Sequence, residues 1–440
     1  MENKAVGICL LGCGIVGSGV VKVLLEQKDL LFRRTGVNFE LRHVVVKSKE
    51  EYPANAAELP MSTDPLPAID DPASQIVVEL IGGTGVAGQF IERALKLGKP
   101  VVTANKALLA VRGPELFALA RQNNTCIAFE ASAGGGIPII DALMRGLVAN
   151  RVDALLGIVN GTCNFILTRM TQNGWGYEQA LKEAQRLGFA EANPAMDVSG
   201  RDAAQKLAIL AGLAFNCRVR EEDIHLEGID KLDAVDLGFA AQFGYVIKLL
   251  AIAERRDNDR ISLRVHPTLV HKDDLLADVS GSFNAISFYG HALGHALFYG
   301  RGAGQMPTAS AVVSDIIGVA LGTTPLQFKQ LNMYPDKVEP VKVLPFDELQ
   351  SRYYVRLTAK DQPGVLAQIT AALGRHWISL SAIHQPESDS NGGVPVVITT
   401  HLANEGAMQS ALKEIDSLPT ILAPTICIRI IDQPQEYGRK

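Results

Sequence analysis

The feature that most constrains the fold is a run of glycines close to the N-terminus, Gly12-Cys-Gly14-Ile-Val-Gly17. It follows an apolar segment that predicts a β-strand and precedes a segment with apolar residues at helical spacing. Gly12 permits a tight turn, Gly14 lets backbone approach a pyrophosphate, and Gly17 lets the helix pack on the strand. The helix N-terminus offers N–H groups and a positive dipole end to phosphates. A dinucleotide-binding domain is therefore predicted, the alternative being a glycine-rich structural turn.

The end of the second predicted strand bears on the choice of cofactor. An acid would follow the strand FELRHVVV if the cofactor were strictly NAD, but Lys47-Ser48-Lys49 follows it. Two cations and a hydroxyl suit a ribose 2′-phosphate, so NADP(H) is expected in preference to NAD(H). The alternative is that Lys47 and Lys49 only face solvent.

Further strand–helix units continue the pattern of a doubly wound α/β sheet. SQIVVELIGG predicts a strand that runs into Gly82, and VVTANKALLA predicts one that ends at Thr103, just before Lys106. Ligands bind at the carboxyl ends of strands in open α/β sheets, so Lys106 is a candidate site residue. The alternative is an ordinary surface lysine.

Composition limits the classes of function. The chain has 440 residues, which predicts about two to four domains, and its 47% apolar content is enough for them to fold. The net charge is −5 without a block of lysines and arginines, which argues against a nucleic-acid partner. The six cysteines form no CxxC pair, which is typical of reduced thiols in the cytoplasm. Glycines break the apolar N-terminal segment, so neither a signal peptide nor a membrane span is predicted.

Residues 188–210, GFAEANPAMDVSGRDAAQKLAIL, gather several charged groups on a predicted helix and the segment before it. Asp202 and Lys206 lie one turn apart on the same helix face, and Glu191 and Asp197 precede them. One reading is an exposed ion pair worth about 0.3 kcal/mol. The other is an active-site wall of carboxylates and a lysine.

Five collinear stretches together resemble the homoserine dehydrogenase family. They are the glycine fingerprint, VVTANKALLA, GIVNGTCNFILTRM at residues 157–170, residues 188–210, and YGRGAGQMPTASAVVSD at residues 299–315. The resemblance covers about residues 4–330 and is specific, because NGTxNxI followed by DxxGxDAAxKL is not generic to nucleotide-binding domains. It implies a nicotinamide enzyme that interconverts L-aspartate 4-semialdehyde and L-homoserine in threonine, methionine and isoleucine biosynthesis.

The resemblance also implies roles for individual residues. Lys206 is the proton donor, and Lys106 lies near nicotinamide and substrate and shares that role. Glu191 and Asp202 match the substrate-binding acids, and Asp197 matches a neighbouring carboxylate of that site, which suits a substrate that carries an α-ammonium group. The expected cofactor-binding residues are Gly12, Gly14, Ile15, Val16, Gly17, Lys47, Lys49, Gly82, Thr103, Lys106, Gly302 and Ala303.

The segment FEASAGGGIPII, residues 129–140, predicts the hinge into a second domain. Its glycines expose carbonyl oxygens, which suit hard cations. By resemblance it holds a structural sodium ion through Glu130, Ala133, Gly135 and Ile137. The alternative is a glycine-rich interdomain turn.

The composition changes after a proline-spotted linker. Residues 353–385 predict a strand, an Asp361-Gln-Pro363-Gly364 turn, a helix and a strand, and a further strand, helix and strand follow. This βαββαβ order resembles an ACT domain, a module that senses amino acids, and threonine is the expected effector. Asp361 and Gly364 are the candidate regulatory residues. The alternative is a ferredoxin-like domain that serves only oligomerisation.

The expected fold class is α/β. The resemblance implies a monofunctional homoserine dehydrogenase with a C-terminal ferredoxin-like (ACT) domain, and we expect it to assemble as a homodimer or homotetramer. Two rival readings stay open: a non-catalytic sensor of nucleotide and amino acid, and a dehydrogenase of another amino-acid aldehyde. The predicted parts are a Rossmann-type NAD(P)-binding domain (1–137), an inserted α+β substrate-binding and dimerisation domain (138–300), a return to the nucleotide domain (301–335), a linker (336–350) and the ACT domain (351–440).

Overall fold

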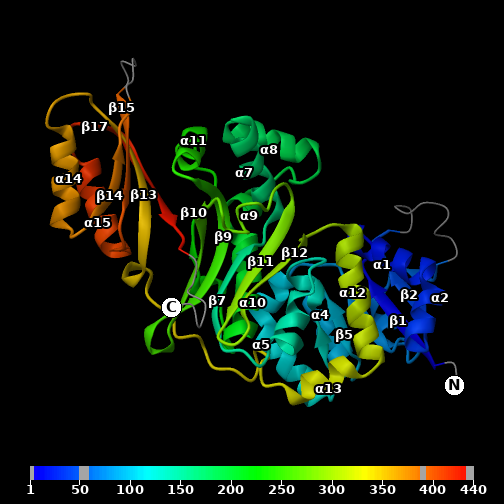
Figure 1. Cartoon of the computed structure of the whole chain (residues 1–440). Coiled ribbons are helices and arrows are strands. Elements are labelled where there is room, and N and C mark those ends of the chain that lie inside the picture. Colours follow the sequence, from blue (N-terminus) through cyan, green and yellow to red (C-terminus); the bar gives the residue numbers. More distant parts are fainter. Residues whose placement is uncertain (1–3, 49–58, 387–392, 433–440) are drawn as a thin grey trace.

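The computed structural model describes residues 4–48, 59–386 and 393–432, which form three parts in a row (Figure 1). The first part is drawn in blue and cyan and alternates strands with helices, as its glycine-punctuated sequence predicts. Its elements are β1 (Lys4–Leu11), α1 (Ile15–Glu26), α2 (Lys28–Thr35), β2 (Val37–Val45), β3 (Met61–Ser62), α3 (Pro65–Asp70), β4 (Ile76–Glu79), α4 (Val86–Lys96), β5 (Val101–Thr103), α5 (Lys106–Gln122) and β6 (Ile127–Ala128).

These strands form a parallel six-stranded sheet in the order β3-β2-β1-β4-β5-β6. This is the strand order of dinucleotide-binding domains, and it confirms the predicted Rossmann-type fold. The order reverses between β1 and β4, so the carboxyl ends of these two strands flank the crevice in which such sheets bind ligands. The glycine fingerprint lies at the end of β1.

The second part begins with short helical turns at η3 (Glu130–Ser132), α6 (Ile139–Asp141) and η4 (Ala142–Gly146) and builds a second sheet covered by helices. Its other elements are β7 (Val152–Ile158), α7 (Gly161–Asn173), α8 (Tyr177–Arg186), α9 (Ala195–Val198), α10 (Arg201–Phe215), η5 (Glu221–Asp223), β8 (His225–Leu226), α11 (Ala234–Gln242), β9 (Tyr245–Arg255), η6 (Asp257–Asp259), β10 (Ile261–His271), β11 (Phe283–Gly290) and β12 (Gly294–Arg301).

The chain then returns to the nucleotide domain through α12 (Gln305–Ala320) and α13 (Thr323–Gln330). Figure 1 shows α12, in yellow, beside α1. The two helices touch closely at Gly19, where an added Cβ would lie 2.8 Å from the Gln305 carbonyl oxygen. Helix α12 therefore packs against the first helix of the nucleotide domain.

The third part, the predicted ACT domain, is a compact unit in which strands and helices follow the order βαββαβ, as predicted. After η7 (Phe346–Glu348) it contains β13 (Gln350–Ala359), α14 (Val365–Arg375), β14 (Leu380–His384), β15 (Val394–Thr400), β16 (Ala403–Asn404), α15 (Glu405–Asp416) and β17 (Ile421–Ile430). Its four long strands lie in the order β17-β13-β15-β14 with both helices on one face.

The ACT sheet is continuous with the sheet of the second part, which the sequence did not predict. Strand β17 pairs with β10 at Thr268–Arg429 and Leu269–Ile430, so one sheet of 11 strands runs through both parts. The junction is also ionic, because buried Asp236 of α11 accepts hydrogen bonds from the Arg356 Nε (2.5 Å) and Nη2 (2.9 Å) atoms of β13.

Among the helices that the structure describes, none is by itself long and apolar enough to cross a membrane. Helices α12 and α13 reach the required length and composition only together, and they are bent by 79° relative to each other.

Candidate active site

A cavity of about 560 Å³ lies between the first and second parts. The nucleotide domain contributes Val16 from α1 and Lys106 from α5, and the second part contributes the start of α7 and one face of α10. The return segment at residues 301–304 closes a further side. This cavity is the candidate active site, because it lies where the Rossmann crevice meets the acid-bearing helix.

The centre of the site is the carboxylate of Asp202, which binds both candidate catalytic lysines. Its Oδ2 atom lies 2.7 Å from Lys206 Nζ on the same helix, and its Oδ1 atom lies 3.2 Å from Lys106 Nζ on α5. Lys206 also donates to the carbonyl oxygen of Val159 at 2.8 Å. The side chains of Asp202 and Lys206 are each only 12% exposed, which excludes the reading of a solvent-exposed pair.

Asn160 connects the carboxylates of Asp202 and Asp197. Its Nδ2 atom donates to Asp197 Oδ1 (2.7 Å) and Asp202 Oδ2 (2.8 Å), while its Oδ1 atom accepts from the Cys163 backbone N–H. The bond from the Cys163 N–H is the N-cap interaction of α7, and it fixes the orientation of the Asn160 amide. A single side chain therefore caps a helix and holds two acids in place.

The pKa values of the Asp197 and Asp202 carboxyl groups are shifted in opposite directions. Burial would raise the pKa of Asp202, but the Lys206 and Lys106 ammonium groups outweigh it and lower that pKa to about 2. Burial raises the pKa of Asp197, and the neighbouring Asp202 charge adds to this effect. Asp202 therefore stays ionised over the physiological range and keeps both lysines at the site.

The nucleotide half of the site has the shape that a pyrophosphate requires. At Gly17 an added Cβ would lie 2.2 Å from the Gly12 carbonyl oxygen, and at Gly12 it would lie 2.9 Å from Leu80. At Gly14, the N-cap of α1, no described atom beyond the adjoining chain lies within 4 Å of an added Cβ, so this space is open to a ligand. Of the next two predicted residues, Val16 lines the cavity and Ile15 is exposed.

Lys47 is exposed just beyond the end of β2, beside the glycine turn. The turn and the strand are linked by a 2.9 Å bond from Gly12 N to the Val45 carbonyl oxygen. Lys49 lies outside the described residues, so its predicted position beside Lys47 is untested.

Buried Glu79 holds the two loops at the ends of β4 and β5. Its carboxylate accepts from the backbone N–H of Gly82 (2.8 Å) and from the Thr103 hydroxyl (2.7 Å). Asn105 caps α5 through Leu108 N and donates to the Gly83 carbonyl oxygen at 2.8 Å. Of the predicted cofactor residues, Thr103 is thus directed towards Glu79, and Gly82 adopts a φ of +78° in an open loop.

The hinge and the return segment meet beside the cavity. Gly302 leaves no room for a side chain, because an added Cβ would lie 1.8 Å from Asn284 Nδ2. At Gly135 an added Cβ would lie 2.3 Å from the Gly302 carbonyl oxygen, and Ala303 lines the cavity next to them. The predicted cofactor residues Gly302 and Ala303 and the predicted cation ligand Gly135 are therefore brought together.

The other predicted cation ligands lie in the same buried loop. Glu130 accepts from Ile140 N (3.0 Å) and Asp141 N (2.7 Å), and burial raises its pKa to about 7. Ala133 and Ile137 are buried beside it. Within the described ranges no cluster of three or more His, Cys, Asp or Glu residues could hold a metal ion.

One predicted substrate-binding residue does not join the cleft, and the predicted regulatory residues lie in another domain. Glu191 is exposed and does not line the cavity, although its segment is next to Phe189, which does. Asp361 and Gly364 line a separate hollow of about 380 Å³ in the ACT domain.

Three polar residues that position the site were not identified from the sequence: Glu79, Asn105 and Asn160. The two asparagines directly precede helices, and an N-cap signal could have marked them. Glu79 ends an apolar strand, and no pattern in the sequence indicates which groups its carboxylate binds.

Comparison with known proteins agrees with this geometry. Residues 12–130 match the NAD-binding domain of homoserine dehydrogenase, residues 138–317 match homoserine dehydrogenase, and residues 353–420 match the ACT domain. The homoserine dehydrogenase of Pseudomonas aeruginosa is 41% identical over 98% of this chain and 99% of its own length. The chain belongs to the homoserine dehydrogenase family. It is therefore an NAD(P)-dependent oxidoreductase, which rules out the non-catalytic sensor.

Other homoserine dehydrogenases show the same correspondence along the whole chain. The Bacillus subtilis enzyme is 40% identical over 95% of this chain and 96% of its own. The crystal structure of the Thiobacillus denitrificans enzyme superposes with a TM-score of 0.91 at 41% identity and covers 99% of both chains. The family likeness thus includes the arrangement of all three parts.

The bridging amide of Asn160 generates the first prediction. Asn160→Asp keeps an oxygen for the α7 cap but places a third carboxylate beside Asp197 and Asp202, and like charges raise each other's pKa. We expect kcat/KM to fall about tenfold or more at neutral pH and the acid limb of its pH profile to move to higher pH. Asn173→Asp, at the exposed end of the same helix, is the matched control. An acid limb that stays in place would contradict the bridging role.

Proposed function

We propose that this enzyme interconverts L-aspartate 4-semialdehyde and L-homoserine with NADP(H), within threonine, methionine and isoleucine biosynthesis. The observation that carries the proposal is the buried Asp202 carboxylate, which forms an ion pair with one lysine from each domain. Such a group binds an amino-acid substrate and supplies a proton only when the nucleotide and substrate domains meet. The arrangement therefore suits reduction of an aldehyde that carries an α-ammonium group.

Lys206 is the group that supplies the proton. Its Nζ atom is held by the Val159 carbonyl oxygen and Asp202, so one N–H remains to point at a substrate oxygen. The bound nicotinamide cofactor supplies a hydride to the aldehyde carbon, or accepts it in the reverse direction. As the carbon–hydrogen bond forms, Lys206 donates a proton to the oxygen, and the Lys106 ammonium stabilises the negative charge that develops there.

The acids position the substrate. Asp202 and Asp197 lie on the same wall as Lys206 and attract an α-ammonium group, which keeps the aldehyde end near the lysines. Glu191 is assigned to the same task by the family resemblance. Its loop would have to close over the cleft to reach the substrate, because the side chain is exposed in this structure.

Removing the Lys206 amine tests the proposed acid. Lys206→Ala, and Lys206→Met with a similar chain length, should lower kcat by about 10²–10⁴-fold, because one general acid is lost. Cofactor affinity should stay close to wild type, since the glycine turn is on the other domain. The measurement is steady-state homoserine oxidation together with a fluorescence titration of reduced cofactor. Turnover close to wild type in both variants would refute the assignment.

The preference for NADP(H) is supported by Lys47. Its exposed ammonium lies past the end of β2, at the position where an acid would bind the ribose 2′-hydroxyl of NAD. A solved hyperthermophilic archaeal homoserine dehydrogenase, 28% identical over 72% of this chain with a TM-score of 0.61, is described as a complex with NADPH. We therefore assign the 2′-phosphate to Lys47 and Lys49, with NAD(H) as the weaker cofactor.

Reversing the charge after β2 tests the cofactor preference. Lys47→Asp with Lys49→Ala should shift the ratio of kcat/KM from NADP towards NAD, because aspartate repels a phosphate and accepts from a hydroxyl. Each lost phosphate contact is worth about tenfold. Lys28→Asp, in α2 of the same domain, controls for net charge. An unchanged ratio would mean that Lys47 and Lys49 only face solvent.

The hinge loop fits a structural sodium ion. Glu130 is buried and Asp315 is partly buried. Burial raises the pKa of both carboxyl groups, and the nearby Glu130 charge adds to the rise at Asp315. In the described chain, no hydrogen bond is donated to the carbonyl oxygens of Ala133 or Gly135, which leaves them free for a hard cation. A monovalent cation held by Glu130, Ala133, Gly135 and Ile137 would compensate the buried charge and brace the hinge.

Threonine is the proposed effector of the ACT domain. Gly364 adopts a φ of +88° and begins α14, so the hollow at residues 361–364 offers backbone N–H groups to a carboxylate. Asp361 is exposed there and can pair with an ammonium group. A route to the active site exists in the shared sheet: β13 leads from this turn to the junction, and β10, β9 and β7 lead on to Val159.

Inhibition of the full chain by threonine tests this assignment. Asp361→Asn should raise the threonine concentration for half-inhibition by about 5–150-fold, the usual range of such coupling, with kcat unchanged. Asp257→Asn, at an exposed turn of the second part, is the matched control. Inhibition that is equal in both variants would place threonine at the active site. If threonine does not inhibit the wild-type enzyme, the domain has only a structural role.

We also assign a homodimer or homotetramer and a cytoplasmic location. The ACT edge strand β14 presents exposed Ile383, 43% accessible, at the end of the shared sheet, which suits pairing with a second copy. The six cysteines are free thiols, as is typical of a reducing compartment.

A further inference from the structure

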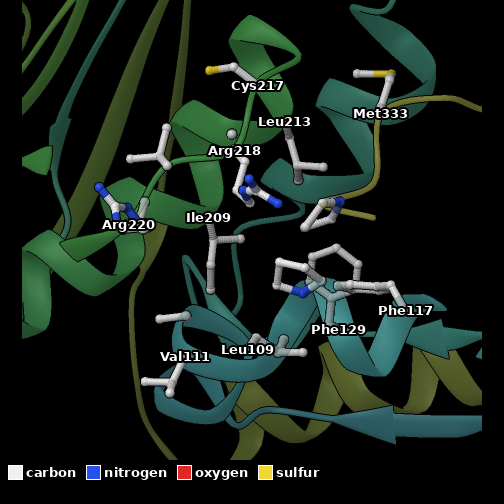
Figure 2. Close-up of a pocket in the computed structure, with 16 residues that line it drawn as sticks. Leu109, Val111, Phe117, Phe129, Ile209, Leu213, Cys217, Arg218, Arg220 and Met333 are labelled. Carbon is white, nitrogen blue, oxygen red and sulfur yellow. The ribbon is translucent and has the colours of Figure 1, made fainter. Parts of the chain in front are cut away.

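A second cavity, of about 240 Å³, lies between helices α5 and α10. Figure 2 shows α5 with Leu109 and Phe117 on one side and α10 with Ile209 and Leu213 on the other. The segment that follows α13, at Met333, closes a third side. This space takes no part in the reaction described above.

The walls are largely apolar, and the two cations among the lining residues are Arg218 and Arg220. Arg218 is half-buried, and Figure 2 shows its guanidinium pointing into the space between the helices. Among the described residues its guanidinium has no ion-pair or hydrogen-bond partner. Its backbone is fixed to the linker, because Arg218 N donates to the Glu339 carbonyl oxygen at 2.7 Å. By contrast, the nearby Arg220 guanidinium pairs with Glu222 and Asp223.

A guanidinium beside apolar walls favours one class of ligand. The cation attracts an anion more strongly where water is partly excluded, and it binds a carboxylate through two parallel hydrogen bonds. The walls favour a hydrocarbon or aromatic body over a polar one. We propose that this cavity binds a small apolar carboxylic acid, with its carboxylate on Arg218, and that this ligand controls how closely the two domains approach.

The coupling follows from the two helices that form the walls. Helix α5 begins at Lys106, and α10 carries Asp202 about two turns and Lys206 about one turn before Ile209. The 3.2 Å Lys106–Asp202 contact therefore depends on the same separation of helices that sets the width of the cavity. A ligand between α5 and α10 fixes this separation and changes cofactor affinity, and by reciprocity the cofactor changes ligand affinity by the same factor.

The test uses the full chain, calorimetric titration and two matched probes, 3-phenylpropanoate and its neutral amide. The acid should bind more tightly than the amide. Arg218→Gln should raise the dissociation constant of the acid about tenfold or more and remove the difference between the probes. Arg220→Gln removes the same charge from an arginine that is already paired, and it should bind the acid as the wild type does.

A second variant tests the place rather than the charge. Val111 lines the cavity and is 71% exposed, so Val111→Trp can fill the mouth without crowding the core, and it should abolish binding of the acid. A saturating concentration of the reduced cofactor should change the affinity of the wild-type enzyme for the acid about fivefold or more. The cofactor is NADH or NADPH, whichever supports turnover. The proposal is overturned if the acid does not bind, if binding survives both Arg218→Gln and Val111→Trp, if homoserine displaces the acid competitively, or if the cofactor leaves its affinity unchanged.

Discussion

The active site depends on one buried carboxylate. Asp202 is attached to the substrate domain, yet one of its oxygens holds Lys106 of the nucleotide domain and the other holds Lys206 of its own helix. A lone buried charge would be very unfavourable, so Asp202 is stable only with these cations and the Asn160 amide around it. The proposed catalytic groups and the contact between domains therefore depend on the same interaction. Anything that separates the domains also leaves Asp202 short of a partner.

Much of the fold could be predicted from local sequence. The glycines of the fingerprint are needed where one backbone segment approaches another, as at Gly12 and Gly17. Such positions can be recognised from the sequence alone. Lys206 and Asp202 were proposed as site residues because their spacing puts them on one helix face and because the stretches around them resemble a known family. Their meeting with Lys106 required the tertiary fold, since no periodicity connects α5 to α10.

What could not be predicted are the contacts made between distant segments. Asn160 was unremarkable as a helix cap until Asp197 and Asp202 folded against it. Glu79 is a strand residue whose importance lies in the two loops it holds. The ACT domain was predicted as a separate unit, but pairing of β17 with β10 depends on a few backbone hydrogen bonds that leave no pattern in composition.

The shared sheet has a consequence for how the chain folds during synthesis. The outer edge of β10 is covered by β8, by the linker at Val343 and by β17, and β17 is synthesised long after β10. Until then the nascent enzyme exposes unpaired backbone groups, which are prone to pair with other chains. Pairing between segments so distant in sequence is also slow, because a long loop must close first. The nascent catalytic domains are therefore expected to rely on chaperones until the regulatory domain is complete.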